Sequence, residues 1–114
     1  MDTANLTMTK IDAALVIAGC TRGRRAGGGV SSADVAQVIG FVIEATPDWS
    51  EYKPGMPRPQ SYLSVDHIGR EQAYAVMLYA KWLTDAGFTV KLGTVKPGSK
   101  KRVVLVLDAP LRAV

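Results

Sequence analysis

The chain has 114 residues, 47% of them hydrophobic, and a formal net charge of +4, values typical of one globular domain over residues 1–114. Cys20 is the only cysteine, which excludes an intramolecular disulfide and a cysteine-rich metal cluster and favours a reducing, cytoplasmic setting. No apolar run reaches the ~18 residues of a membrane span, and the first residues lack the basic start of a signal peptide.

The chain begins with a segment that we expect to be a loose tail, residues 1–8. Thr9 and Asp12 fit a capping box ahead of an apolar run, which predicts a short buried helix over residues 10–20. A strand over residues 13–18 is the alternative, because the periodicity of a short apolar run does not separate helix from strand.

Residues 21–30 read TRGRRAGGGV and predict a flexible basic loop. Its arginines, Arg22, Arg24 and Arg25, together with exposed backbone N–H groups, are suited to contact phosphates. The alternative is a solvated connection whose arginines only aid solubility. The loop is not a nucleotide-binding P-loop, because no glycine-lysine-serine/threonine sequence follows the glycines.

The next segment carries the spacing of an amphipathic helix. Ser31 and Asp34 fit a second capping box, and apolar residues recur at helical intervals to Ile43, which predicts a helix over about residues 32–44. Phe41 falls toward its polar side, as an exposed contact or beneath the following loop.

Four prolines make residues 47–60 a rigid, Pro-rich loop. Trp49 and Tyr52 within it are interpreted in two ways. They either anchor a partner, as aromatic side chains do at interfaces, or fold back over the core.

The C-terminal half predicts a short strand over residues 61–65, a long helix over 70–86 and a β-hairpin of residues 88–95 and 101–108. Gly87 should end the helix in a Schellman motif with a contact between Leu83 and Phe88. Pro97 and Gly98 fit the centre of a turn that sets Lys96 opposite Ser99.

Continued outward, this turn fixes the hairpin register. It pairs Leu92 with Val103, Val90 with Leu105 and Phe88 with Leu107, all on one face. The second strand is apolar on both faces, so it should have another neighbour in the sheet. Residues 61–65, residues 13–18 and another chain are the candidates. The fold class is therefore α+β, with two to three helices packed on a small, mainly antiparallel sheet around this hairpin.

The sequence shows no constellation typical of catalysis. His67 is the only histidine, and we expect it on the surface near the helix start, where Asp66 would act as a cap. Neither the serines nor the acids show the spacing of a catalytic pair. We therefore expect no enzyme activity, no catalytic residue, no metal and no cofactor.

Two hypotheses for function follow. In the first, a small basic module contacts nucleic acid or another polyanion through loop 21–30 and the hairpin tip, residues 96–102. The long connections between the helices argue against a helix-turn-helix. The cations assigned to this surface are Arg22, Arg24, Arg25, Lys96, Lys100, Lys101 and Arg102.

In the second, the chain is a protein-interaction module or small inhibitor, encoded by a bacterium or phage and homodimeric. The contact would be made by the apolar-edged helix 70–86 and the Trp49–Tyr52 loop. The side chains assigned to it are Phe41, Trp49, Tyr52, Tyr74, Met77 and Leu78.

Overall fold

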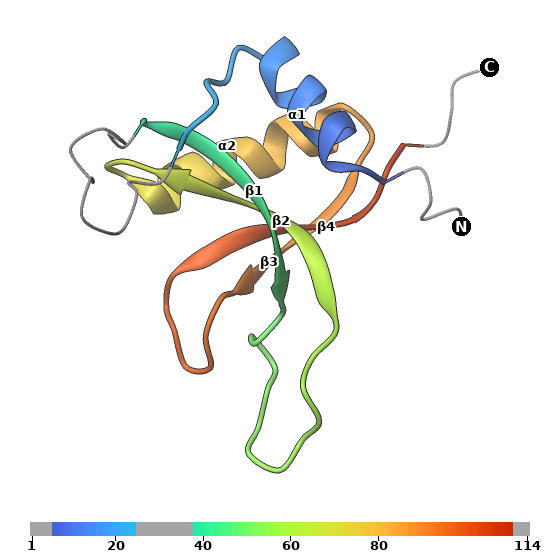
Figure 1. The fold of residues 1–114 in the computed structure, drawn as a ribbon, viewed down its shortest axis with the longest axis vertical. Helices are drawn as coiled ribbons and strands as arrows, with labels where there is room; N and C mark the ends of the chain where they lie inside the picture. The colour runs from blue at the N-terminus through green and yellow to red at the C-terminus, as the bar shows by residue number, and fades with distance from the viewer. Residues whose placement is uncertain (1–5, 25–37, 111–114) are drawn as a thin grey trace, which may run out of the picture.

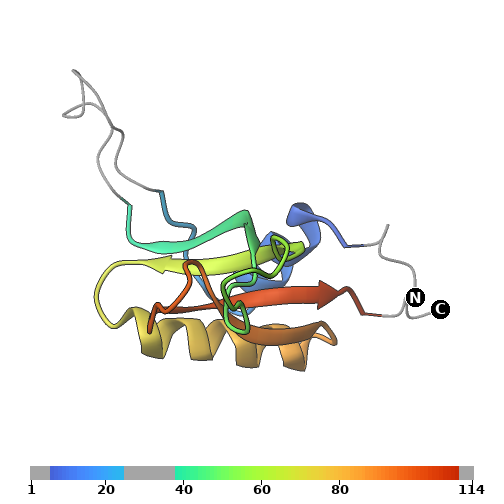
Figure 2. The same ribbon diagram turned by 90° about the horizontal axis from the view of Figure 1, so that it is seen from below.

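The computed structural model describes residues 6–24 and 38–110, which form an α+β fold of two helices and a four-stranded antiparallel sheet (Figures 1 and 2). The strand order is β1-β2-β4-β3. Helix α2 lies along one face of the sheet, and α1 packs against α2 and β1. The predicted fold class is confirmed. The elements in chain order are α1 (Met8–Ile17), β1 (Gly40–Pro47), β2 (Ser61–Ile68), α2 (Gln72–Asp85), β3 (Thr89–Thr94) and β4 (Arg102–Asp108).

The core forms where the helices meet the sheet. Leu83 of α2 and Leu15 of α1 are fully buried, as is Val65 in the middle of β2. Strand alternation places Val104 and Val106 of β4 on the same side of the sheet as Val65, because β2 and β4 pair in register there. Other members of this cluster are Ile11, Phe41, Val76, Tyr79, Phe88 and Ala109.

The first helix is confirmed, and the alternative of a strand over residues 13–18 is wrong. Its N-cap is Thr7, two residues before the predicted Thr9, and the Thr7 hydroxyl accepts a hydrogen bond from the Lys10 backbone N–H at 3.2 Å. Because the cap comes earlier, residue 8 belongs to the helix rather than to the expected tail.

The end of α2 has the predicted Schellman geometry. The Phe88 N–H donates to the Leu83 carbonyl at 2.9 Å, and the Gly87 N–H donates to the Thr84 carbonyl at 3.0 Å. Gly87 has φ +94°, which a side chain would disfavour. Leu83 and Phe88 both lie in the core, so this cap also fixes the direction in which β3 begins.

The predicted helix over residues 32–44 is wrong for residues 40–44, which form β1, while residues 32–37 lie outside the described part of the chain. Valine and isoleucine at helical spacing are also favourable in a strand, and pairing with a neighbouring strand decides between helix and strand here. All eight residues of β1 pair with β2, so β1 and β2 form a long hairpin around the Pro-rich loop.

The hairpin is confirmed, but its predicted register is wrong by one residue. The turn itself forms as expected: the Ser99 N–H donates to the Lys96 carbonyl, and Gly98 has φ +73°. Beyond the turn, Thr94 pairs with Arg102, so one residue on the β3 side opposes two on the β4 side. Leu92 consequently pairs with Val104.

The register error has a clear cause. Because β4 is apolar on both faces, either face satisfies the hydrophobic pattern of β3. Val103 and Leu105 are fully buried on the face of the sheet opposite Val104. The second neighbour of β4 is β2, which was one of the three candidates and is longer than the predicted 61–65.

Candidate polyanion-binding surface

The structure brings the two predicted basic regions to the same end of the sheet. Arg22 forms a parallel bridge with Phe41, and Phe41 pairs with His67. By the register that pairs Val65 with Val104, Arg102 at the start of β4 comes beside His67. Three strand spacings, about 14 Å, therefore separate the backbones of Arg22 and Arg102.

Three cations at the hairpin tip are exposed and unneutralised. Lys96, Lys100 and Arg102 form no ion pair with any residue in 6–24 or 38–110. Their positive charge is thus free to attract an anion. Lys101 differs, because its Nζ lies 3.1 Å from Asp66 Oδ2.

Asp66 anchors this end of the hairpin. Its side chain is only 1% exposed, and its Oδ1 accepts hydrogen bonds from Gln72 Nε2 at 2.9 Å and from the His67 backbone N–H at 2.7 Å. Gln72 Nε2 also donates to the Arg102 carbonyl at 2.6 Å. The network ties β2, the first turn of α2 and the hairpin tip together.

Burial by itself would raise the pKa of Asp66. The hydrogen bonds from Gln72 and from the His67 backbone, together with Lys101, outweigh burial and lower that pKa from its usual 3.8. The carboxylate is therefore ionised at neutral pH, and the positive charge of Lys101 compensates its negative charge. The prediction that Asp66 caps α2 is wrong, since Asp66 lies within β2 and the N-cap position is Glu71.

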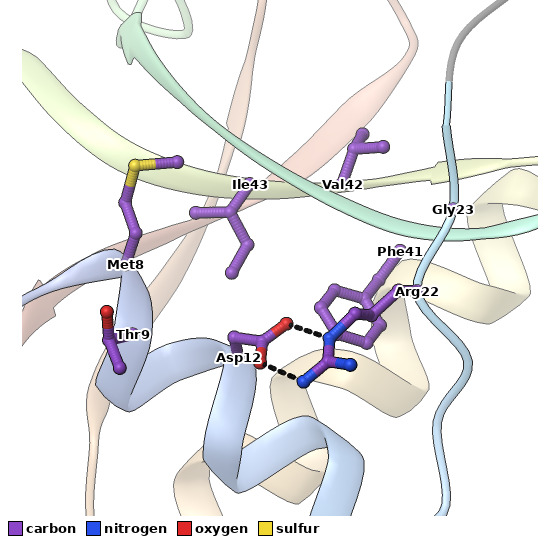
Figure 3. A pocket seen from close by; sticks show the side chains of 8 residues that line it. All are labelled: Met8, Thr9, Asp12, Arg22, Gly23, Phe41, Val42 and Ile43. Carbon is purple, nitrogen blue, oxygen red and sulfur yellow. Dashed lines mark hydrogen bonds and ion pairs between the residues drawn. The ribbon is translucent and has the colours of Figure 1, made fainter.

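The second basic region is partly neutralised (Figure 3). Arg22 donates from both Nε and an Nη to the two oxygens of Asp12 in α1, each at 2.7 Å. This pair lowers the pKa of Asp12 and spans a hollow of about 400 Å³ between α1 and β1. Arg24 is exposed and bridges Val38, while Arg25 lies outside the described residues.

Two hollows adjoin the hairpin tip. One, of about 470 Å³, lies between the start of the Pro-rich loop and the hairpin, and its lining includes Trp49, Thr94 and Lys100. The other, of about 450 Å³, lies between α2 and the hairpin, with Val76 and Met77 among its apolar lining. Both are lined by Leu92, Lys100 and Arg102.

The residues assigned to a protein interface divide by exposure. Phe41 is 2% exposed and packs edge-on against Tyr79, so it belongs to the core and cannot contact a partner. Trp49 and Tyr52 are half-buried and stack edge-to-face with ring centroids 4.9 Å apart, and Leu78 is also half-buried. Tyr74 and Met77 are each 62% exposed on α2.

The prediction that His67 lies on the surface near a helix start is wrong. This residue lies half-buried in β2, and its Nδ1 is 2.6 Å from the hydroxyl of Tyr79. His67 lies two residues after Val65 in β2, so its ring points to the same face of the sheet, the one that the helices cover. Among the described residues, no group of three histidine, cysteine or acidic side chains is arranged to hold a metal ion.

Sequence reasoning missed the buried hydroxyl of Thr94, the Asp66 network and the Lys91–Asp48 ion pair, which joins β3 to the Pro-rich loop at 2.8 Å. No local pattern marks them, because the Asp66 network and the Lys91–Asp48 pair join segments far apart in the chain, and the burial of the Thr94 hydroxyl depends on the tertiary fold. Within the described residues, no helix is long and apolar enough to cross a membrane. Comparison with protein families, curated proteins and solved structures gives no significant match to this chain.

Proposed function

We propose that this protein is a non-enzymatic binding module for nucleic acid or another polyanion, with the hairpin tip as the main contact. The observation that carries the proposal is the set of three exposed cations at the hairpin tip, Lys96, Lys100 and Arg102, which form no ion pair with the described residues. A lysine or arginine side chain without an acidic partner binds a phosphate or sulfate most favourably, because no ion pair has to be broken first.

Segment 21–24 is a secondary contact in this proposal. It lies about three strand spacings from the tip, within reach of one polyanion chain. The Asp12 pair weakens the contribution of Arg22, so binding should depend more on the tip than on this segment.

The test is retention on heparin and on a DNA column as a function of salt. Each phosphate contact releases counterions, so affinity for a polyanion falls steeply as salt rises. We expect Lys96→Ala, Lys100→Ala and Arg102→Ala each to reduce the log–log salt slope by about 0.7–0.9. The matched control is Lys81→Ala, because Lys81 is exposed on α2 but already paired with Asp85 at 2.9 Å.

If retention and its salt slope are unchanged in the triple variant of Lys96, Lys100 and Arg102, the polyanion proposal is wrong. An equal loss in the Lys81→Ala control would also contradict it, because the effect would then follow net charge rather than the tip.

A second candidate function, a protein contact or homodimer seam, is favoured by one observation. Tyr74 and Met77 are neighbours on one face of α2 and both expose large apolar side chains. Tyr74→Ser with Met77→Ser should then abolish dimerisation in sedimentation experiments. A wild-type protein that stays monomeric at high concentration would contradict the homodimer.

A further inference from the structure

We infer that the hollow between Trp49 and the hairpin tip binds one nucleotide of a single-stranded nucleic acid, with the base beside Trp49 and the phosphate beside Lys100 and Arg102. The inference rests on the proposed function and adds the ligand class and its location. Its evidence is a buried unpartnered hydroxyl, the distribution of charge around the hollow, and an aromatic wall.

The hydroxyl is that of Thr94, which lines this hollow. Thr94 is 8% exposed, and its Oγ1 has no hydrogen-bond partner among the described residues. Buried polar atoms are nearly always paired, since an unpaired one costs free energy. Because Oγ1 is itself covered, a ligand group in the hollow would satisfy it once the Thr94 side chain rotates toward the hollow.

Charge is distributed unevenly around the hollow. The hairpin contributes the cations Lys100 and Arg102, whereas the Pro-rich loop contributes Glu51. A phosphate is attracted to the first wall and repelled from the second. A base suits the second wall, because a glutamate accepts hydrogen bonds from N–H groups on a base edge, such as N3–H of thymine and uracil.

Trp49 gives the second wall an aromatic surface. Its backbone N–H donates to the Thr94 carbonyl at 3.2 Å, so the loop is fixed against the edge of β3. Bases of a single strand stack on such side chains, whereas bases in a duplex are already stacked and paired. The volume of about 470 Å³ lies in the range of small-ligand sites.

The test compares four probes: a fluorescein-labelled oligothymidine, the corresponding oligouridine, a DNA duplex of equal charge, and heparin. Heparin carries charge without bases, so it reports on the polyanion surface alone. We expect the single strands to bind more tightly than the duplex. The two single-stranded arms decide whether DNA or RNA is preferred.

Two pairs of variants separate the hollow from the charge. Thr94→Val should weaken oligothymidine binding about fivefold, the loss of one hydrogen bond, while Thr94→Ser keeps the hydroxyl and the affinity. Trp49→Leu should weaken it about tenfold, while Trp49→Phe keeps a stacking surface and stays within about twofold. Heparin affinity should not change in any of the four.

The melting temperature of each variant is measured alongside, so that loss of fold is not mistaken for loss of binding. In a Trp82→Phe background, the emission of Trp49 should be quenched by oligothymidine and not by heparin. Equal binding of duplex and single strand overturns the inference, as does an unchanged affinity in both Thr94→Val and Trp49→Leu.

The outcomes also distinguish the inference from the proposed function. If heparin and oligothymidine bind and both lose affinity only in the lysine and arginine variants, the polyanion surface stands and the nucleotide site is wrong. If neither probe binds the wild-type protein, the proposed function fails, and the inference fails with it.

Discussion

Tyr79 shows how one buried side chain can make folding sensitive to alkaline pH. Its ring packs in the core, and its hydroxyl is 2.6 Å from His67 Nδ1. Burial, with smaller contributions from Cys20 and Asp66, raises the pKa of Tyr79 from 10.0 to about 12. The unfolded chain therefore loses this proton at a lower pH than the folded protein.

This difference predicts a loss of stability in base. The contribution of Tyr79 is fully present below pH 10 and disappears as the pH rises toward about 12, a total of about 2–3 kcal/mol. Urea unfolding at pH 8 and pH 11 should show about half of this total, because pH 11 lies about one unit above the unfolded-state pKa and one below the folded-state pKa. Tyr79→Phe should be less stable at pH 8, because the hydrogen bond to His67 is lost, but should lose less stability between the two pH values. Parallel losses in both proteins would contradict the assignment.

At the scale of elements, the end of α2 predicts the effect of a single methyl group. A Cβ at Gly87 would lie 2.8 Å from Pro110 Cβ in a backbone conformation with φ +94°. We expect Gly87→Ala to cost about 2–3 kcal/mol, from backbone strain and the contact with Pro110 together. Thermal unfolding measures the loss.

Gly55→Ala is the matched control. Gly55 has φ +92°, nearly that of Gly87, but a Cβ there meets nothing within 4 Å. It should cost only the strain, about 1 kcal/mol. If the two variants lose equal stability, the contact with Pro110 contributes nothing.

The features that were predicted correctly from the sequence are specified by residues close together in the chain. The Leu83–Gly87–Phe88 cap and the Pro97–Gly98 turn need only neighbouring residues, and both formed as expected. The apolar segment that includes Val42 and Ile43 has no such local signal, because its spacing suits a helix as well as a strand. Only pairing with β2, where Ile43 lies opposite Val65 and Val42 opposite Asp66, makes it a strand. The hairpin register failed for the same reason, since nothing local to β4 distinguishes its two apolar faces.

The candidate site was predictable only in part. Clustered cations at the hairpin tip were visible in the sequence, and three of them prove exposed and unpaired within the described residues. The ion pairs Asp66–Lys101 and Asp12–Arg22 could be recognised only from the fold, because each joins separate segments of the chain. The hollow beside Trp49 likewise arises where the Pro-rich loop meets β3, a contact that the sequence of neither segment predicts.

At the scale of the whole molecule, three aspartates hold separate segments together. Asp12 pairs α1 with segment 21–24, Asp48 pairs the Pro-rich loop with β3 through Lys91, and Asp66 joins β2 to the hairpin tip. At Asp48 and Asp66, burial raises the pKa but hydrogen bonds and the nearby lysine lower it more. At Asp12, the Arg22 hydrogen bonds lower it directly. All three therefore have a folded-state pKa below the usual 3.8.

Acid should consequently loosen the whole structure rather than one site. Stability from a lowered carboxylate pKa is present above about 3.8 and is lost as the pH falls through the folded-state value. We expect the melting temperature to fall as the pH is lowered from 5 to 3. Asp66→Asn should cost about 2 kcal/mol at neutral pH and should flatten this fall, because the buried ion has gone. Asp85→Asn, which removes an exposed partner of Lys81, should cost only a few tenths of a kcal/mol and leave the acid slope intact. An acid slope in Asp66→Asn as steep as in the wild type would show that the network at the hairpin tip does not control acid stability.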